Sequence, residues 1–380
     1  MNMKKLKVLL VGIGGYAANY VREMRDYGIP GGLELAGIVD PYADKSPLYE
    51  DAKSMTSIFC NSTEEFYENH QADIAVICTP IPLHAPQAIC CMEHGSHVML
   101  EKPIAGTPED AQLIIDAQKR TGMKLAIGFQ WCNDPAMYAF RQDVRAGLFG
   151  NILSMRALVI WPRDIAYYNR GSGWAGKKYD KNGHPIFDSV ASNATAHYLF
   201  NMLWVSGKEL TDVQAFTARA NPIETYDTIV LKGKLGSADL TYVATHAGGS
   251  AVIQNPMFEY VFEKGSVSFG GYGQDGGELT FRFNDGSVKE YGVSHTSGGQ
   301  RMHKMWDLIE LVTGATSKVA CTAEEALLHT NAMAAVRAVR PDSYAFPEDQ
   351  VRLDDGMYWV PGLTDKLIDC YERRALPDSI

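Results

Sequence analysis

The stretch Lys7-Val8-Leu9-Leu10-Val11-Gly12-Ile13-Gly14-Gly15-Tyr16-Ala17 decides the fold of this chain. Its apolar first half is typical of a short buried strand, and helical character follows from Ala18 to Tyr27. Gly12 permits a tight turn, Gly14 lets the backbone approach a phosphate group, and Ala17 keeps the helix close to the strand. The order strand, glycine-rich turn, helix predicts a dinucleotide-binding unit.

Gly15 and Tyr16 complete this turn at the start of the helix. The N-terminus of a helix favours anions because its free N–H groups and its dipole point toward them. We therefore expect Gly12, Gly14, Gly15 and Tyr16 to contact the phosphates of the cofactor.

A second strand, Leu33 to Val39, ends in Asp40. An acid at this position can accept hydrogen bonds from the ribose diol of the adenosine half, and it repels a 2'-phosphate. The residues that follow are Pro41, Tyr42 and Ala43, and the next cation is more distant at Lys45. The sequence therefore favours NAD over NADP, with Asp40 as a cofactor ligand.

A lysine follows a later strand of the same region. His97-Val98-Met99-Leu100 is typical of a buried strand, and Glu101-Lys102-Pro103 comes directly after it. Ligands of open parallel sheets bind at the carboxyl ends of the strands. Pro103 ends the strand and fixes the direction of the chain. We therefore expect Lys102 to meet the nicotinamide half of the cofactor.

Strands and helices alternate up to about Gly128, and this alternation predicts parallel strands with right-handed crossovers. Other elements of this alternation are the strand Ala72 to Cys78, the helix Ala85 to Glu93, and a helix whose N-cap is Thr107. The expected fold class is α/β, with a doubly wound Rossmann domain over residues 1–128.

Residues 129–380 are expected to form a second, α+β domain that binds the substrate and supports oligomerisation. Many strands follow one another there without intervening helices, which indicates a large, mostly antiparallel open sheet. A helix is expected from Ser189 to Trp204, and a capping box at Thr322 opens another that runs to about Val339. The expected strands are 152–160, 212–218, 228–235, 238–246, 257–269, 279–283 and 288–293, with a hairpin turn at 284–287.

Composition excludes several classes of function. The formal net charge is −10 and no cluster of lysine and arginine stands out, which argues against a nucleic-acid partner. No apolar stretch is long enough to span a bilayer and no secretion signal opens the chain, so we expect a cytoplasmic protein. The 7 cysteines show no C-x-x-C spacing, and we expect reduced thiols and no metal. An exposed face of the open sheet favours a homo-oligomer, a dimer or a tetramer.

Taken together, the G-I-G-G-Y-A turn, Thr79-Pro80, His84, H-V-M-L-E-K-P and a later histidine resemble the Gfo/Idh/MocA oxidoreductases. The resemblance is strongest from Val8 to Gly128. It implies a Rossmann domain, an open-sheet domain, and a sugar, polyol or related substrate held between them. It also implies cofactor contacts from Thr79, Pro80, His84, Glu101, Lys102 and Gln130.

In that family the lysine of the E-K-P motif transfers a proton or binds a hydroxyl, and the Lys-Pro bond is often cis; Lys102 is that lysine here. Relatives commonly carry an aspartate four residues before a histidine, and this chain has Asn193 before His197. On one helix this spacing puts both side chains on one face. Asparagine can orient a hydroxyl but cannot take a proton, so proton handling shifts to Lys102 and His197. Asp188 is a weaker candidate that can also serve as an N-cap.

A polar and aromatic loop precedes this helix, with Arg163 and Tyr167 among its residues. Aromatic faces pack on the C–H faces of sugar rings, and arginine hydrogen-bonds hydroxyl or acid groups. Arg163 and Tyr167 are therefore candidate substrate contacts, although an interface favours the same residue types.

The sequence thus predicts an NAD-dependent dehydrogenase. A secondary alcohol of a carbohydrate-like substrate would lose its proton to Lys102 and its hydride to NAD. Base action requires the pKa of Lys102 to fall from ~10.4 toward ~7 to 8. Two alternatives remain open. One is an NAD-dependent glycosidase or lyase that oxidises the sugar only transiently, and the other is a non-enzymatic regulator that senses NAD.

Overall fold

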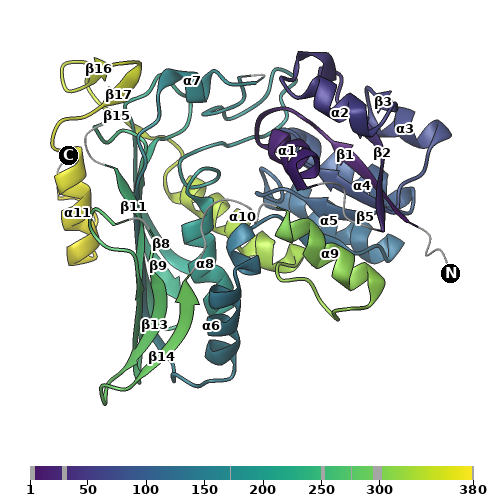
Figure 1. Ribbon diagram of the computed structural model, residues 1–380. Coiled ribbons are helices and arrows are strands. Elements are labelled where there is room, and N and C mark those ends of the chain that lie inside the picture. The colour runs from purple at the N-terminus through teal and green to yellow at the C-terminus, as the bar shows by residue number, and fades with distance from the viewer. Residues whose placement is uncertain are drawn as a thin grey trace. The chain divides into compact units, whose positions relative to one another are not determined.

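The computed structural model divides into two compact units (Figure 1). The first comprises residues 1–133 and 297–327, and the second comprises residues 134–296 and 328–380. The residues that the structure describes are 5–27, 32–171, 173–249, 253–274, 276–293 and 302–378. Among them, no helix combines the length and the apolar character needed to cross a membrane.

The first unit is built on a six-stranded parallel sheet with the order β3-β2-β1-β4-β5-β6. This is the doubly wound arrangement expected from the sequence. Its strands are β1 (Leu6–Val11), β2 (Leu33–Val39), β3 (Phe59–Cys60), β4 (Ile74–Ile77), β5 (His97–Leu100) and β6 (Leu125–Ile127).

Helices connect these strands, and short 3-10 turns precede several of them. The α-helices are α1 (Ala18–Tyr27), α2 (Tyr49–Met55), α3 (Thr63–Asn69), α4 (His84–Glu93), α5 (Pro108–Thr121) and α9 (His303–Thr313). The 3-10 helices are η1 (Gly15–Ala17), η2 (Ala43–Lys45), η3 (Ile81–Leu83) and η4 (Gln130–Asn133). Thr107 caps α5 as expected, since its hydroxyl accepts a hydrogen bond from Asp110 N at 3.2 Å.

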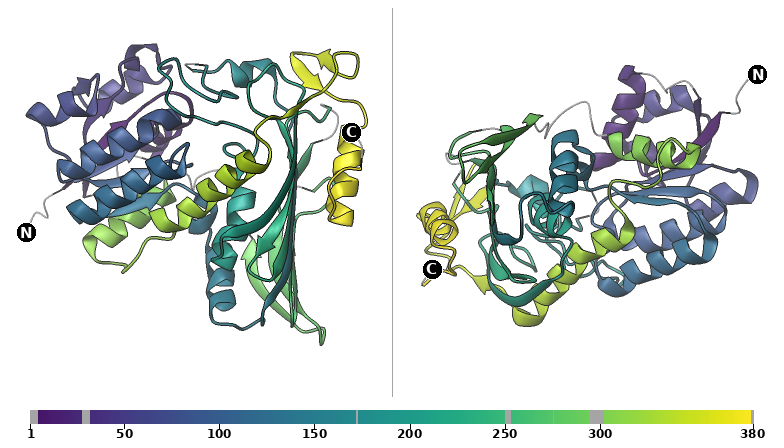
Figure 2. Two further views of the ribbon diagram at one scale, coloured as in Figure 1. Left: turned by 180° about the vertical axis from the view of Figure 1, so that it is seen from behind. Right: turned by 90° about the horizontal axis from the view of Figure 1, so that it is seen from below.

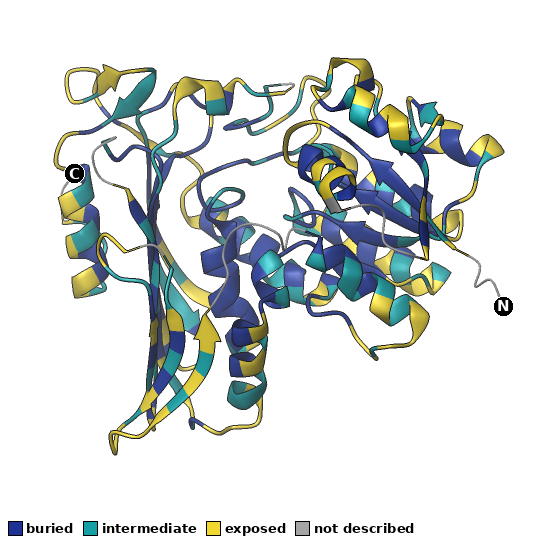
Figure 3. Ribbon diagram, viewed as in Figure 1, coloured by how far each residue is buried: buried dark blue, intermediate teal, exposed yellow. Residues whose placement is uncertain are grey.

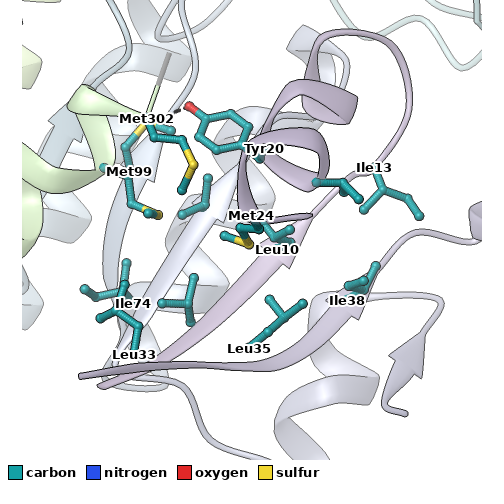
Figure 4. Close-up of a cluster of buried hydrophobic side chains, with 14 of the residues drawn as sticks. Leu10, Ile13, Tyr20, Met24, Leu33, Leu35, Ile38, Ile74, Met99 and Met302 are labelled. Atoms are coloured by element: carbon teal, nitrogen blue, oxygen red, sulfur yellow. Dashed lines mark hydrogen bonds between the residues drawn. The ribbon is translucent and has the colours of Figure 1, made fainter. Parts of the chain in front are cut away.

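The core of the first unit contains side chains from a segment far along the chain. Met302, Met305 and Leu308 pack with Leu10, Ile74 and other strand residues in one apolar cluster. Figure 4 shows Met302 and Met99 beside the ring of Tyr20. Burial of these side chains ties α9 to the sheet. The division expected at residues 128 and 129 therefore differs from the observed one, because residues 297–327 return to the first unit.

The second unit contains a nine-stranded sheet with the order β14-β13-β12-β11-β7-β10-β9-β8-β15. Its pairs are antiparallel except for β7 with β10 and β8 with β15. The strands are β7 (Ile152–Ile160), β8 (Leu210–Arg219), β9 (Thr228–Leu235), β10 (Ala238–Thr245), β11 (Gln254–Phe262), β12 (Gly265–Phe269), β13 (Glu278–Phe283), β14 (Val288–Val293) and β15 (Tyr344–Ala345). A separate pair consists of β16 (Arg352–Asp354) and β17 (Met357–Trp359).

Helices cover both faces of this sheet. Helix α11 (Leu363–Arg373) lies on the face opposite α8 (Ala196–Ser206), as the views in Figure 2 show. Its side chains Leu363, Leu367 and Tyr371 join an apolar cluster with Leu158 and Val243 of the central strands. The remaining helices are α6 (Pro135–Arg145), α7 (Ile165–Tyr168) and α10 (Ala323–Val339), the last opened by the expected reciprocal bonds of the Thr322 capping box.

The structure corrects two predicted elements. The strand expected over 257–269 is two strands, because the chain turns at Glu263 and Lys264 and β12 begins at Gly265, whose φ is +156°. The helix expected from Ser189 begins only at Ala196. Before that point the hydroxyls of Ser189 and Ser192 bond each other's backbone N–H groups, and such local bonds compete with a helix.

Candidate functional site

The turn after β1 has the backbone that its glycines predict. Gly12 has a φ of +92°, and a Cβ at this position would lie 2.9 Å from the carbonyl oxygen of Cys78. Gly12 is therefore required both by conformation and by the close approach of β4. At Gly14 and Gly15 an added Cβ would meet no atom of the described residues within 4 Å. The protein thus leaves space over these two glycines.

Asp40 is fixed beside this turn. One oxygen of its carboxylate accepts a hydrogen bond from Ile13 N at 3.0 Å, and the other accepts one from Tyr42 N at 2.9 Å. A carboxylate has more lone pairs than these two bonds use. The side chain is therefore held in place and can still accept hydrogen bonds from a diol.

His84 connects the ends of β4 and β5. Its ring nitrogens lie 2.9 Å from the carbonyl oxygens of Thr79 and Pro103, and the side chain is buried. Burial lowers the pKa of His84, and the two carbonyl contacts oppose that change. Because both nitrogens are engaged, this geometry suits a residue that positions Thr79 and Pro103. The neighbouring Pro80 precedes η3 as its N-cap.

The carboxylate of Glu101 is clamped at the end of β5. One oxygen accepts a hydrogen bond from Tyr20 Oη at 2.8 Å and pairs with the ammonium of Lys304, which comes from α9. The other oxygen accepts a longer bond of 3.3 Å from Lys102 N. Gly128 leaves room for this carboxylate, since an added Cβ would lie 2.8 Å from it. The backbone of Lys102 is therefore anchored through its neighbour, and the Lys102-Pro103 peptide bond is cis.

The ion pair lies in a buried environment. Lys304 is 1% exposed and Glu101 is 5% exposed. Burial alone would lower the pKa of Lys304, but the Glu101 carboxylate outweighs burial and raises that pKa above its ordinary value. Burial, reinforced by Glu101, raises the pKa of Tyr20 well above its ordinary value. Lys304 therefore stays charged and neutralises Glu101, while Tyr20 stays a neutral donor.

Tyr16 connects the glycine-rich turn with η4. Its hydroxyl donates a hydrogen bond to Gln130 Oε1 at 3.3 Å, and the ammonium of Lys304 lies 4.9 Å from the centre of its ring. Thus Gln130, Tyr16 and Glu101, the three predicted cofactor contacts of this region, are connected through Lys304 in the first unit.

In the second unit, His197 and Asn193 do not share a helix. His197 lies in the first turn of α8 and is buried, whereas Asn193 lies in the turns that precede the helix. Figure 3 shows α8 buried along its length. The prediction that both side chains lie on one helical face is therefore wrong, because the helix starts at Ala196.

Asp188 is buried and is not the N-cap of α8, which is Thr195. Its carboxylate accepts a hydrogen bond from Gly176 N at 2.7 Å. Its backbone carbonyl accepts one from the hydroxyl of Thr225. Asp188 thus fixes the loop that precedes α8.

Arg163 and Tyr167 lie close together, and their role as substrate contacts stays a prediction. The guanidinium carbon of Arg163 is 5.3 Å from the centre of the Tyr167 ring. Burial raises the pKa of Tyr167, and the nearby Asp188 adds to this effect.

Sequence reasoning missed Lys304 and Tyr20. Both residues contact Glu101 only in the folded protein, since Lys304 is 203 residues away from it in the chain. The one available signal was a lysine within an apolar helical stripe, next to Met305 and four residues before Leu308. A buried lysine of this kind requires a buried carboxylate.

A family model matches most of the first unit. Residues 6–129 match the family model GFO_IDH_MocA, described as an oxidoreductase family with an NAD-binding Rossmann fold. Residues 6–129 thus form an NAD-binding Rossmann domain of the Gfo/Idh/MocA family. The matched family binds NAD, and NAD fits the structure, because the space over Gly14 and Gly15 and the fixed carboxylate of Asp40 suit a pyrophosphate and a ribose.

Several curated proteins are similar to this chain. An inositol 2-dehydrogenase of Rubrobacter xylanophilus is 23% identical over 70% of this chain and 71% of its own length. An alpha-N-acetylgalactosaminidase of Bacteroides fragilis is 31% identical over 31% of this chain and 29% of its own length. A 4-carboxy-2-hydroxymuconate-6-semialdehyde dehydrogenase of Sphingobium sp. is 25% identical over 37% of this chain and 44% of its own length. This chain therefore spans less than half the length of two of these relatives.

A solved structure shows the same fold over both units. The WlbA dehydrogenase of Bordetella pertussis, in complex with NADH and UDP-GlcNAcA, is 24% identical. It superposes with a TM-score of 0.71 over 89% of this chain and 97% of its own. The mixed, mostly antiparallel sheet after the Rossmann domain is thus a shared feature of fold.

Proposed function

We propose that this oxidoreductase transfers a hydride between NAD and a secondary alcohol or ketone of a sugar, a polyol or a sugar derivative. The observation that carries the proposal is the clamp on Glu101, which anchors the backbone of Lys102 at the carboxyl end of β5. Ligands of parallel sheets bind at this edge. The similarity to an inositol 2-dehydrogenase supports a polyol or sugar substrate.

Lys102 handles the proton in this proposal. As a neutral amine it accepts the proton of the substrate hydroxyl, and as an ammonium it donates a hydrogen bond to the ketone oxygen in the reverse direction. NAD, when bound, takes up the hydride from the carbinol carbon. Gly12, Gly14, Gly15 and Tyr16 would hold its phosphates, and Thr79, Pro80 and Gln130 would line its nicotinamide half.

His197 is the second proton-handling residue in the proposal, and Asn193 orients a substrate hydroxyl. An amide side chain can donate and accept hydrogen bonds but cannot take a proton at neutral pH. The acid that relatives commonly carry at the position of Asn193 is therefore replaced by a residue that binds without titrating.

Asp40 sets the preference for NAD over NADP in this proposal. Its carboxylate is held by Ile13 N and Tyr42 N at the edge of the phosphate-binding turn. A 2'-phosphate at this position would meet a fixed negative charge at close range. The diol of NAD would instead donate hydrogen bonds to the free lone pairs.

A second candidate function is a redox-neutral glycosidase or lyase that oxidises the sugar only transiently. The similarity of 31% of this chain to an alpha-N-acetylgalactosaminidase favours this candidate. The same Lys102 chemistry would serve the oxidation step, and no NADH would accumulate.

One experiment separates the two candidates. The full-length protein is incubated with NAD⁺ and a panel of hexoses, inositols, sugar acids and aryl glycosides, and both NADH absorbance and product mass are recorded. A dehydrogenase produces NADH and a ketone in equal amounts. A glycosidase releases the aryl group without net NADH. Absence of both products would contradict the proposal.

A homo-oligomer, dimer or tetramer, stays a prediction. Its premise was an exposed apolar sheet face, and the structure shows that α11 covers the apolar centre of one face through Leu363, Leu367 and Tyr371. Beside this helix the face carries the ion-paired Arg156 and Glu259. Light scattering of the purified full-length protein would give the number of subunits.

A further inference from the structure

The short helix α7 presents two arginines to one tyrosine ring. Asp164 caps the helix by accepting a hydrogen bond from Tyr167 N at 2.9 Å. Arg163 precedes the helix and Arg170 follows it, so the single turn brings both guanidinium groups back to the same side chain. Their central carbons lie 5.3 Å and 3.6 Å from the centre of the Tyr167 ring.

Aromatic rings and backbone carbonyls hold both guanidinium groups. Arg163 lies 5.5 Å from the Trp161 ring and donates a hydrogen bond from Nη1 to the Pro162 carbonyl at 3.0 Å. Arg170 lies 5.0 Å from the Trp174 ring and donates from Nη1 to the Tyr167 carbonyl. Each bond uses one N–H group and leaves the others of the guanidinium fork for a ligand.

No carboxylate forms an ion pair with these two cations within the part of the chain that the structure describes, although the buried carboxylate of Asp188 is near enough to add to the effect of burial on the pKa of Tyr167. Neither Arg163 nor Arg170 forms an ion pair there, and the Asp164 carboxylate serves the cap of α7. Arg156 of the same unit shows the usual solution, since it pairs with Glu259 at 2.8 Å and with Glu372 at 3.0 Å. Two half-buried cations on one ring repel each other, and a bound anion would relieve that repulsion.

A buried histidine with an unused ring nitrogen adjoins the same ring. His246 is 2% exposed, and its ring centre lies 5.4 Å from that of Tyr167. Its Nδ1 is 2.9 Å from the hydroxyl of Tyr168, whereas Nε2 has no hydrogen-bond partner among the described residues. Its carbonyl accepts a hydrogen bond from Arg163 N at 3.2 Å, which ties it to the arginine pair. Burial, followed by the charges of Arg163 and Arg170, lowers the pKa of His246 well below its ordinary value, so the ring is neutral.

We propose that Arg163, Arg170 and His246 form a subsite for an anionic group of the substrate, a carboxylate or a phosphate ester. The inference rests on the proposed function, because it names acidic sugars or sugar phosphates as the substrate class. Planar guanidinium groups bind both kinds of oxyanion through paired, charge-assisted hydrogen bonds. The His246 Nε2 atom supplies one further polar contact. The rings of Tyr167, Trp161 and Trp174 keep the guanidinium groups in place when no ligand is bound.

The test measures binding directly and does not depend on turnover. Full-length protein saturated with NAD⁺ is titrated calorimetrically with glucuronate, gluconate, glucose 6-phosphate, glucose and inositol. We expect at least one acidic compound to bind roughly 10-fold or more tighter than its neutral counterpart. A carboxylate preference and a phosphate preference each support the subsite and name the source of the anion.

Variants assign that preference to the arginines. Arg163→Gln and Arg170→Gln should each remove most of the preference for the acid over its neutral counterpart. Arg282→Gln removes an exposed positive charge on β13 and should keep the preference. Arg163→Lys and Arg170→Lys retain the charge and the packing but lose the fork, so a partial loss is expected; these variants serve if the glutamine variants do not fold.

The outcomes separate this inference from the proposed function. Acids that bind no tighter than neutral sugars, or a preference that survives both arginine substitutions, would overturn the subsite, and the arginines would then only pack the aromatic loop. NADH formation from neutral sugars alone would also contradict the subsite and support the dehydrogenase. An arginine-dependent preference without any NADH formation would support the subsite and count against the dehydrogenase.

Discussion

The ammonium group of Lys304 forms an ion pair with the carboxylate of Glu101 inside the first unit, although 203 residues separate them in the sequence. Tyr20 donates a hydrogen bond to the same carboxylate oxygen at 2.8 Å. Both charged side chains are almost fully excluded from solvent. The residue that follows Glu101 is Lys102, so this pair anchors the segment to which the chemistry is assigned.

Removing one partner of this pair should destabilise the protein strongly. Lys304→Met leaves an uncompensated buried carboxylate, and we expect a loss of about 3–5 kcal/mol in the free energy of unfolding. Lys304→Met combined with Glu101→Gln should lose much less than the sum of the two single changes, because no buried charge remains. Urea denaturation followed by fluorescence measures both effects.

The matched control is the exposed pair of Lys119 and Glu324, whose charged atoms are 3.9 Å apart. Lys119→Met should change the free energy of unfolding by less than about 0.5 kcal/mol. Equal losses for Lys304→Met and Lys119→Met would show that the buried pair has no special role.

Two glycines of the first turn should respond differently to alanine. Gly12→Ala imposes a side chain on a φ of +92° and brings Cβ to 2.9 Å from the Cys78 carbonyl, so we expect a loss of about 2 kcal/mol or more in stability. Gly14→Ala meets no described atom within 4 Å and should cost less than about 1 kcal/mol. Its added methyl group would instead weaken NAD binding roughly 10-fold or more, because the pyrophosphate must approach there.

Thermal unfolding without cofactor and calorimetric titration with NAD measure these two properties separately. Wild-type NAD affinity in Gly14→Ala would show that the pyrophosphate does not contact this turn.

The first unit was predictable because its signals are local. The glycines of the turn, Asp40 after its strand and the strand before Glu101 each lie within a few residues of the element that they define. The return of α9 to the same unit was not predictable in this way, since Lys304 and Met305 act only through contacts with residues from the other end of the chain.

In the second unit, local hydrogen bonds made the predicted start of a helix wrong. Ser189 and Ser192 bond each other's backbone and delay α8 until Ala196, which separates Asn193 from the helix of His197. The turn at Glu263 and Lys264 lacks the residues typical of a hairpin, so two strands looked like one.

Asp40 should control the choice of cofactor. Asp40→Asn keeps an acceptor for Ile13 N but removes the negative charge, so the affinity for NADP should rise roughly 10-fold relative to that for NAD. Titration of both cofactors into wild-type and variant protein gives the ratio. An unchanged ratio would mean that Asp40 does not face the ribose.

The buried His246 should make the protein less stable in acid. Its pKa in the folded chain lies well below the value near ~6.5 of an unfolded chain, so between these two values the unfolded state binds a proton that the folded state does not. The contribution of the neutral His246 to the free energy of unfolding is complete above pH ~6.5. Below that value it falls as the pH falls, by at most about 1.4 kcal/mol per pH unit.

Urea denaturation between pH ~7.5 and ~5.5 measures this slope. His246→Gln should flatten it. A slope that His246→Gln does not alter would show that this histidine already binds its proton in the folded protein.

The rate of hydride transfer in Lys102→Met shows whether Lys102 handles the proton of the substrate. Wild-type protein, Lys102→Met and the exposed control Lys119→Met are mixed with NAD⁺ and the most active alcohol of the panel, and NADH formation is followed under saturating conditions. We expect Lys102→Met to be slower by ~100-fold or more while its affinity for NAD stays within about threefold of the wild type. A Lys102→Met rate within about threefold of the wild-type rate would contradict the assignment of proton transfer to Lys102.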